Sequence, residues 1–164
     1  MPKQTAFPPI CWDRPKQEPV FTEAGPYRAW VVASGNSCIW RIEPEGKPEG
    51  HVVGIELMTA RDPSESPLRG LYRSIASVAP GSPVTVLTSV EYVRDVLNRC
   101  CRLKAGELWR RENGEHLANA DIWDDIRAEI MERNLAITAR PALTSRDNEI
   151  IKELKKTLRK ASKA

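Results

Sequence analysis

Short apolar runs separated by turn residues follow one another from residue 27 to residue 58. The runs 27–33 and 37–42 are rich in aromatic and β-branched side chains and flank the pair Gly35-Asn36, a pattern that predicts a β-hairpin. A third run, residues 51–58, follows the Gly- and Pro-containing segment 46–50, which predicts a further turn. Three strands joined by short turns make an antiparallel meander.

The apolar spacing then changes to the three-and-four period of helices. Ser66 followed by Pro67 predicts a helix start, with serine as the N-cap and proline at the first helical position. After the stop at Pro80-Gly81, residues 83–87 form an apolar run that indicates a buried strand. Thr88 and Glu91 have the spacing of a capping box, which predicts another helix immediately after that strand. Because a helix connects the meander to the strand 83–87, we expect this strand to lie parallel to the first one.

The last third of the chain predicts a helix, a short strand and a final helix. The segment 119–123 begins the first of these helices, residues 136–140 form the strand, and the segment 144–147 begins the last helix. We assign Trp123 to the core, on the apolar face of its helix. The residues expected to face inward from the last helix are Ile150, Ile151, Leu154 and Leu158.

The composition is that of a globular domain of ordinary size. Of the 164 residues 41% are hydrophobic and 29% are charged, enough apolar material for one core. Five prolines in residues 1–24 predict an extended N-terminal arm, attached through Phe7 and Trp12, before a single domain over residues 25–164. No apolar run approaches the roughly 20 residues that span a bilayer, so we expect no membrane association and a cytoplasmic location.

Cysteine, histidine and charge patterns add little specific chemistry. The four cysteines show no Cys-x-x-Cys spacing, and neither histidine lies in a metal-ligand pattern, so no metal site is predicted from them. Residues 152–164 carry six basic side chains against Glu153, a local charge of +5 in a chain of net charge +3. Clustered positive charge of this kind attracts phosphate groups, although a solvated helix face is the commoner explanation.

The order of elements and three short sequence motifs resemble those of the type 1 ribonuclease H family. These motifs are Glu56-Leu57-Met58, Tyr92-Val93-Arg94 and Asn119-Ala-Asp-Ile-Trp123, and the resemblance covers roughly residues 27–161. It implies an α/β fold of the ribonuclease H-like class, with a five-stranded mixed sheet in the order 3-2-1-4-5 flanked by helices.

The resemblance also implies a two-metal active site, and the chain departs from it. The family uses four carboxylates around two Mg²⁺ ions, because Mg²⁺ requires hard oxygen ligands. At the corresponding positions this chain has Ala33, Ser89 and Lys152, and only Glu56 retains a carboxylate. We therefore expect a degenerate site in a pseudoenzyme, with no cofactor unless the chain is active with Mg²⁺.

The nucleic-acid-binding part of the family is better retained. In the family the helix-and-loop segment after the fourth strand forms a basic handle that contacts a duplex, and Asn119 matches a position that helps to hold a backbone phosphate. The handle residues of this chain are Arg99, Arg102, Lys104, Trp109, Arg110 and Arg111. The resemblance thus implies binding of an RNA–DNA hybrid or another duplex, through phosphate contacts that do not read sequence.

Two alternatives remain open from the sequence. The first is an active Mg²⁺-dependent endoribonuclease with a rebuilt site, in which Glu91, Asp147 or Glu149 joins Glu56. The second is a protein-interaction scaffold that uses the Pro-rich arm or an exposed sheet edge.

Overall fold

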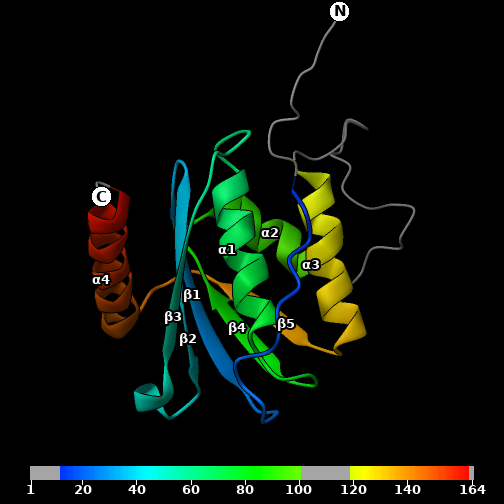
Figure 1. The fold of residues 1–164 in the computed structure, drawn as a ribbon. Helices are drawn as coiled ribbons and strands as arrows, with labels where there is room; N and C mark the ends of the chain where they lie inside the picture. The colour runs from blue at the N-terminus through cyan, green and yellow to red at the C-terminus, as the bar shows by residue number, and fades with distance from the viewer. Residues whose placement is uncertain (1–11, 101–118, 163–164) are drawn as a thin grey trace, which may run out of the picture.

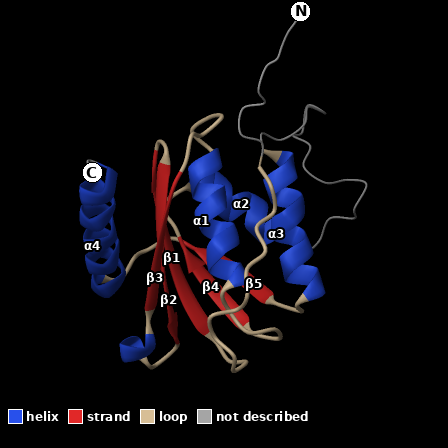
Figure 2. Cartoon of the chain, viewed as in Figure 1, coloured by secondary structure: helices blue, strands red, loops and turns tan. Residues whose placement is uncertain are grey.

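The computed structural model describes residues 12–100 and 119–162, which form a five-stranded sheet with helices on both faces (Figures 1 and 2). In chain order the elements are β1 (Tyr27–Ser34), β2 (Ser37–Pro44), the short 3₁₀ helix η1 (Pro48–Gly50), β3 (Val52–Leu57), α1 (Glu65–Ala76), β4 (Pro83–Leu87), α2 (Glu91–Cys100), α3 (Ala120–Glu132), β5 (Ala136–Arg140) and α4 (Ser145–Ser162). The sheet order is β3-β2-β1-β4-β5. Strands β1, β4 and β5 are parallel, whereas β2 is antiparallel to both of its neighbours. The predicted fold class and strand order are confirmed.

The β1–β2 hairpin has the turn that the sequence predicts. Ser34 pairs with Ser37, so Gly35 and Asn36 are the two turn residues. Gly35 has a φ of 55°, a left-handed conformation that glycine adopts without steric cost. This tight turn lies at the carboxyl end of β1, next to the candidate site.

The start of α1 lies earlier than the sequence indicates. The helix begins at Glu65, and Ser66 and Pro67 lie inside its first turn. The Asp62 carboxylate accepts hydrogen bonds from the N–H and the hydroxyl of Ser64, at 2.9 and 2.5 Å. The prediction that Ser66 caps this helix is therefore wrong, because Asp62 organises the turn before it.

The start of α2 is also shifted with respect to the predicted capping box. Thr88 Oγ1 accepts a hydrogen bond from the Val90 N–H at 3.2 Å, and the helix begins at Glu91. A capping box would instead join the Thr88 side chain to the N–H of Glu91. The position of the helix is as expected, but the predicted capping bond is not formed.

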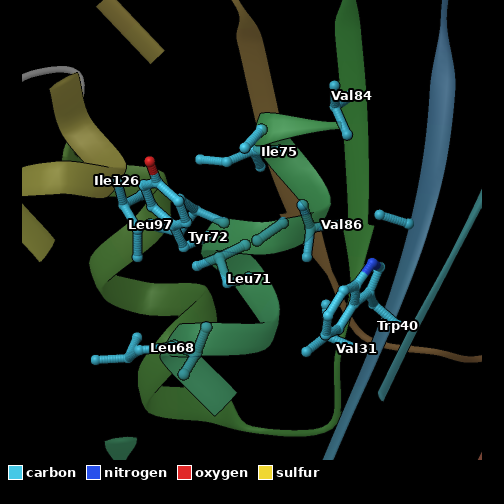
Figure 3. Close-up of a cluster of buried hydrophobic side chains, with 14 of the residues drawn as sticks. Val31, Trp40, Leu68, Leu71, Tyr72, Ile75, Val84, Val86, Leu97 and Ile126 are labelled. Carbon is cyan, nitrogen blue, oxygen red and sulfur yellow. The ribbon is translucent and has the colours of Figure 1, made fainter. Parts of the chain in front are cut away.

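The helices are divided between the two faces of the sheet. Helices α1, α2 and α3 cover one face and α4 alone covers the other (Figure 1). On the three-helix face the core contains Val31, Trp40 and Leu71, among the side chains drawn in Figure 3, together with the fully buried Trp123. The assignment of Trp123 to the core is confirmed. None of the helices among the described residues is long and apolar enough to cross a membrane.

A second, smaller core lies between α4 and the sheet. All four apolar residues predicted to face inward from the last helix are buried there against Trp30, Val32, Ile39 and Leu87. The lysines of α4 are exposed, as their spacing predicts. The amphipathic pattern of α4 thus identifies which side of the helix contacts the sheet.

Helix α1 approaches the Val31 side chain of β1 closely at Gly70. A Cβ atom at Gly70 would lie 2.8 Å from Cγ1 of Val31, which is closer than real Cβ contacts allow. The glycine therefore permits this close approach of helix and sheet. The approach brings Arg69 and Arg73, on α1, within hydrogen-bonding distance of Glu56 on the edge strand β3.

The described part of the N-terminal arm packs against α1 and α3. Trp12 is 7% exposed, and its indole Nε1 donates a hydrogen bond to Asp125 Oδ2 at 2.6 Å. Its ring also makes an edge contact with Tyr72, at 5.2 Å between centroids. The predicted attachment through Trp12 is confirmed, whereas Phe7 lies outside the described residues.

Candidate functional site

Glu56, the carboxylate that the resemblance assigns to a family position, is held between two arginines. Arg69 Nη1 donates to Glu56 Oε2 and Arg73 Nε donates to Glu56 Oε1, both at 2.8 Å. The Glu56 side chain is only 15% exposed. Each carboxylate oxygen thus already has a positively charged partner, and charge-assisted bonds of this kind are stronger than those between neutral groups.

This ion pair belongs to a longer row of alternating charges. Arg69 also binds Glu65 Oε2, at 2.6 Å from Nη2, and Glu65 Oε1 accepts from Arg61 Nε at 2.8 Å. Arg61 in turn donates to both carboxylate oxygens of Asp121, at 2.9 and 3.2 Å. The row therefore links the end of β3, the first two turns of α1 and the start of α3.

Glu65 is the carboxylate of this row that the sequence did not single out. Its side chain is fully buried. Burial alone raises the pKa of its carboxyl, but hydrogen bonds from the Arg61 backbone and from the Arg61 and Arg69 side chains outweigh burial and lower the pKa. The i,i+4 spacing of Arg61, Glu65 and Arg69 was the available sequence signal.

A hollow of about 300 Å³ lies where β1 ends and α1 begins. We call it the β1–α1 hollow; its lining residues are Ala33, Gly35, Pro63, Ser64, Ser66, Pro67, Val90 and Tyr92. No acidic side chain is among them. Ser66 is 1% exposed, and its hydroxyl is buried with no hydrogen-bond partner.

The four residues that the resemblance assigns to the metal site are not all brought together. Ala33 lines the β1–α1 hollow, and Ser89 is exposed in the loop after β4, directly before Val90 of the same hollow. Glu56 is two strands away from Ala33, because Ala33 pairs with Cys38 and Cys38 pairs with Glu56. Two strand spacings amount to about 10 Å. Lys152 is exposed on α4, which covers the opposite face of the sheet (Figure 1).

Asn119 fixes the loop that precedes α1. Its Nδ2 donates to Asp62 Oδ1 at 3.0 Å and to Ser64 Oγ at 2.8 Å. Burial raises the pKa of the Asp62 carboxyl, but the hydrogen bonds from Ser64 and Asn119 outweigh burial and lower it. The Asn119 amide therefore lies beside the β1–α1 hollow, and phosphate binding by this residue stays a prediction.

The described residues do not fit the pair of Mg²⁺ ions that the resemblance implies. Mg²⁺ requires oxygen ligands in near-octahedral geometry, whereas the described lining of the β1–α1 hollow offers hydroxyl groups and no carboxylate. Residues 12–100 and 119–162 contain no group of three His, Cys, Asp or Glu side chains that could hold a metal ion.

The residues of the rebuilt-site alternative are also dispersed. Asp147, on α4, is 3% exposed and accepts a hydrogen bond from Trp30 Nε1 at 3.0 Å, within the core on the other face of the sheet. Glu149 is exposed on the same helix, and Glu91 is exposed at the start of α2. The carboxylate connected to Glu56 is Glu65 instead, through the guanidinium of Arg69.

Most of the basic handle lies outside the described residues. Arg99 belongs to the last turn of α2, but its side chain is not described. Arg102, Lys104, Trp109, Arg110 and Arg111 all fall in residues 101–118, beyond the described part of the chain. The ends of α2 and α3 that flank this segment both belong to the three-helix face of the sheet (Figure 1).

No protein-family model matches the chain, and no curated protein matches it. Solved structures of similar fold include the foamy viral protease-reverse transcriptase in complex with double-stranded DNA. That match has a TM-score of 0.51 and 12% identity, and covers 79% of this chain and 88% of the other. The same viral protein in complex with an RNA/DNA hybrid has a TM-score of 0.56 and 12% identity, and the match covers 92% of this chain but only 22% of the other.

At this identity the similarity concerns the fold. The mixed sheet in the order β3-β2-β1-β4-β5, with four α-helices around it among the described residues, is shared with these structures. The chain therefore has a ribonuclease H-like fold.

Proposed function

We propose that this protein is a nucleic-acid-binding module of ribonuclease H-like fold that does not cleave its ligand. It binds an RNA–DNA hybrid or another duplex through the basic segment 99–111. Two observations carry the proposal: the described lining of the β1–α1 hollow contains no carboxylate, and Glu56, two strands away from Ala33 of that hollow, is held by two arginines.

Electrostatics supports the absence of a metal-dependent reaction. A divalent cation near Glu56 would have to displace Arg69 and Arg73 from bonds of 2.8 Å and would then lie beside two positive charges. Repulsion between like charges a few ångström apart costs several kcal/mol at the effective dielectric constant of a protein surface. Glu56 is thus better suited to holding α1 against β3 than to binding a metal.

The charge of the segment 99–111 supports duplex binding. It contains five arginine and lysine residues together with Trp109, and the single acid Glu107. A segment with this density of positive charge binds the phosphates of a nucleic acid, and counterions are released from the nucleic acid. Proteins of the same fold are known in complex with double-stranded DNA and with an RNA/DNA hybrid. Asn119 supplies a polar side chain at the far end of the same connection, beside the β1–α1 hollow.

Charge reversal in the handle tests the binding part of the proposal. We expect Arg110→Glu with Arg111→Glu to weaken binding of a labelled RNA–DNA hybrid by about 10- to 100-fold at low salt. The slope of log K against log salt should also become shallower by about 2, since each lost phosphate contact removes about one unit. Fluorescence anisotropy over a series of salt concentrations measures both quantities.

The matched control changes the same charge elsewhere. Lys16→Glu with Lys47→Glu alters two exposed lysines of the described chain, one in the arm and one in the β2–β3 connection, and we expect it to weaken binding by less than about 3-fold. Equal effects of the two double variants, or binding that does not depend on salt, would contradict the assignment of the handle.

A second candidate function is a protein-interaction scaffold. The observation in its favour is the edge strand β3, where Val53, Ile55 and Leu57 are 45%, 42% and 59% exposed. An exposed strand edge can accept a further strand from a partner. Under this alternative Ile55→Lys removes function while the Arg110→Glu and Arg111→Glu changes leave it intact, which is the reverse of the result expected for nucleic-acid binding.

A further inference from the structure

A second hollow, of about 360 Å³, lies between the carboxyl end of β1 and the C-terminal half of α4. We call it the β1–α4 hollow. Val32, Ala33 and Leu158 give it apolar walls, and Lys155 and Arg159 contribute the positive charges. Two hydroxyl-bearing residues, Ser34 and Ser162, also line it, and no acidic side chain is among the described lining residues.

The hollow follows from the way α4 is attached to the sheet. The N-terminal half of the helix is fixed by large groups, through the Trp30–Asp147 hydrogen bond and the buried Ile150 and Ile151. At the other end, the β1 residue that follows Val32 on this face of the sheet is Ser34, the last residue of the strand. Its small side chain cannot fill the space beneath the helix.

The two cations of this hollow have no partner within the described chain. Lys155 and Arg159 are one helical turn apart, and neither forms an ion pair or a side-chain hydrogen bond among residues 12–100 and 119–162. Across the sheet, by contrast, Arg69 and Arg73 both form ion pairs with Glu56. The charge of Lys155 and Arg159 is thus available to a ligand.

The size and chemistry of the hollow select one class of ligand. A guanidinium and an ammonium one turn apart suit a phosphate group, which accepts several hydrogen bonds from such donors. The apolar walls suit the sugar or base attached to that phosphate. A volume of about 360 Å³ is at the small end of ligand cavities, and is suited to one nucleotide rather than to a base pair.

We propose that the β1–α4 hollow binds one nucleotide, with its phosphate between Lys155 and Arg159 and its sugar or base against Val32 and Leu158. The inference rests on the proposed function, because the nucleotide would be an unpaired residue or an end of the bound strand. Ala33 lines both this hollow and the β1–α1 hollow. A strand bound at the end of β1 can therefore continue from one hollow to the other.

Nuclear magnetic resonance on the full chain tests this site directly. Titration of the ¹⁵N-labelled protein with 2′-deoxyadenosine 5′-monophosphate should shift the amide signals of Ser34 and of residues 155–162. Deoxyadenosine, which lacks the phosphate, should bind at least 10-fold more weakly. Shifts confined to other residues, or equal affinity for the two compounds, would overturn the proposal.

A pair of variants with equal charge separates a site from general attraction. Lys155→Gln with Arg159→Gln should weaken nucleotide binding at least 10-fold. The control, Lys156→Gln with Lys160→Gln, removes the same charge from exposed positions of the same helix that do not line the hollow, and should change the affinity less than 2-fold. Equal weakening by the two double variants would show that nucleotide binding depends on net charge alone, and would overturn the proposed site. Circular dichroism melting of all variants checks that α4 stays folded.

Two further measurements test whether the hollow binds a nucleotide that belongs to a longer strand, and separate this inference from the proposed function. The tetranucleotide (dA)₄ should bind more tightly than the mononucleotide and should lose affinity in Lys155→Gln with Arg159→Gln. Mononucleotide binding without tetranucleotide binding would overturn the role of the hollow in strand binding. Hybrid binding that depends on Arg110 and Arg111 but not on Lys155 and Arg159 would overturn this inference alone, and leave the proposed function in place.

Discussion

Replacement of Glu65 with glutamine is expected to lower the free energy of unfolding by about 3 to 5 kcal/mol at pH 7, the usual cost of removing one partner from a buried ion pair. The Glu65 side chain is fully buried and binds both Arg61 and Arg69. Glutamine keeps the shape of the side chain but leaves the Arg69 guanidinium, 12% exposed, with less compensation for its charge. Urea unfolding followed by circular dichroism measures the difference.

The effect of Glu65→Gln should depend on pH in a defined direction. Because the pKa of this carboxyl is lowered in the folded protein, its contribution to stability is complete above the pKa of the unfolded chain, about 4.3. The contribution is lost as the pH falls through the lower pKa of the folded state. The difference in unfolding free energy between wild type and Glu65→Gln should therefore be constant from pH 7 to about pH 5 and should become smaller below about pH 4.

An exposed ion pair on the same side of the molecule provides the control. Glu132 is 63% exposed and lies 3.2 Å from Arg14, so Glu132→Gln should cost less than about 1 kcal/mol. A cost for Glu65→Gln as small as that of the control, or one that does not narrow in acid, would show that the buried row of charges is not formed in solution.

Replacement of Trp30 with alanine should be similarly severe, at about 3 to 5 kcal/mol. Trp30 is fully buried between the sheet and α4, and its indole donates to the buried Asp147 at 3.0 Å. The guanidinium carbons of Arg41 and Arg146 lie 5.9 and 5.5 Å from the centroid of its ring, within the range of cation–π attraction. The variant thus creates a cavity and also leaves Asp147 without its indole donor.

Hydrogen exchange would locate the effect of Trp30→Ala. We expect faster exchange of the α4 amides than of the α1 amides, because Trp30 belongs to the core on the α4 side. Leu143→Ala, at a side chain 79% exposed just before α4, should change stability by less than about 0.5 kcal/mol. A loss below 1 kcal/mol for Trp30→Ala, with α4 still protected, would contradict this description of how the helix is attached.

The sequence predicted most of the fold because local patterns specify it. The Gly35-Asn36 turn and the spacing of Ile150, Ile151, Leu154 and Leu158 each restrict one element to one arrangement. The errors concern helix starts, because a side chain from outside the helix can determine where the helix begins. Asp62, and not Ser66, organises the start of α1.

The candidate site was less predictable, because its geometry depends on contacts between elements. The partners of Glu56, Arg69 and Arg73, follow it by 13 and 17 residues, and only the close approach of α1 at Gly70 brings them together. Nothing in the local pattern indicates that Glu65 is buried. The handle residues Arg102 to Arg111 lie outside the described residues and stay predictions.

The most direct test is a single-turnover assay with the full chain in excess over a 5′-labelled RNA–DNA hybrid. The reactions contain Mg²⁺, Mn²⁺ or a chelator, and parallel samples measure how much hybrid is bound. We expect the hybrid to be bound in all three conditions and the RNA strand to remain intact. Cleavage that requires a divalent metal and disappears in Glu56→Gln would contradict the claim that the two arginines keep this carboxylate from a catalytic role.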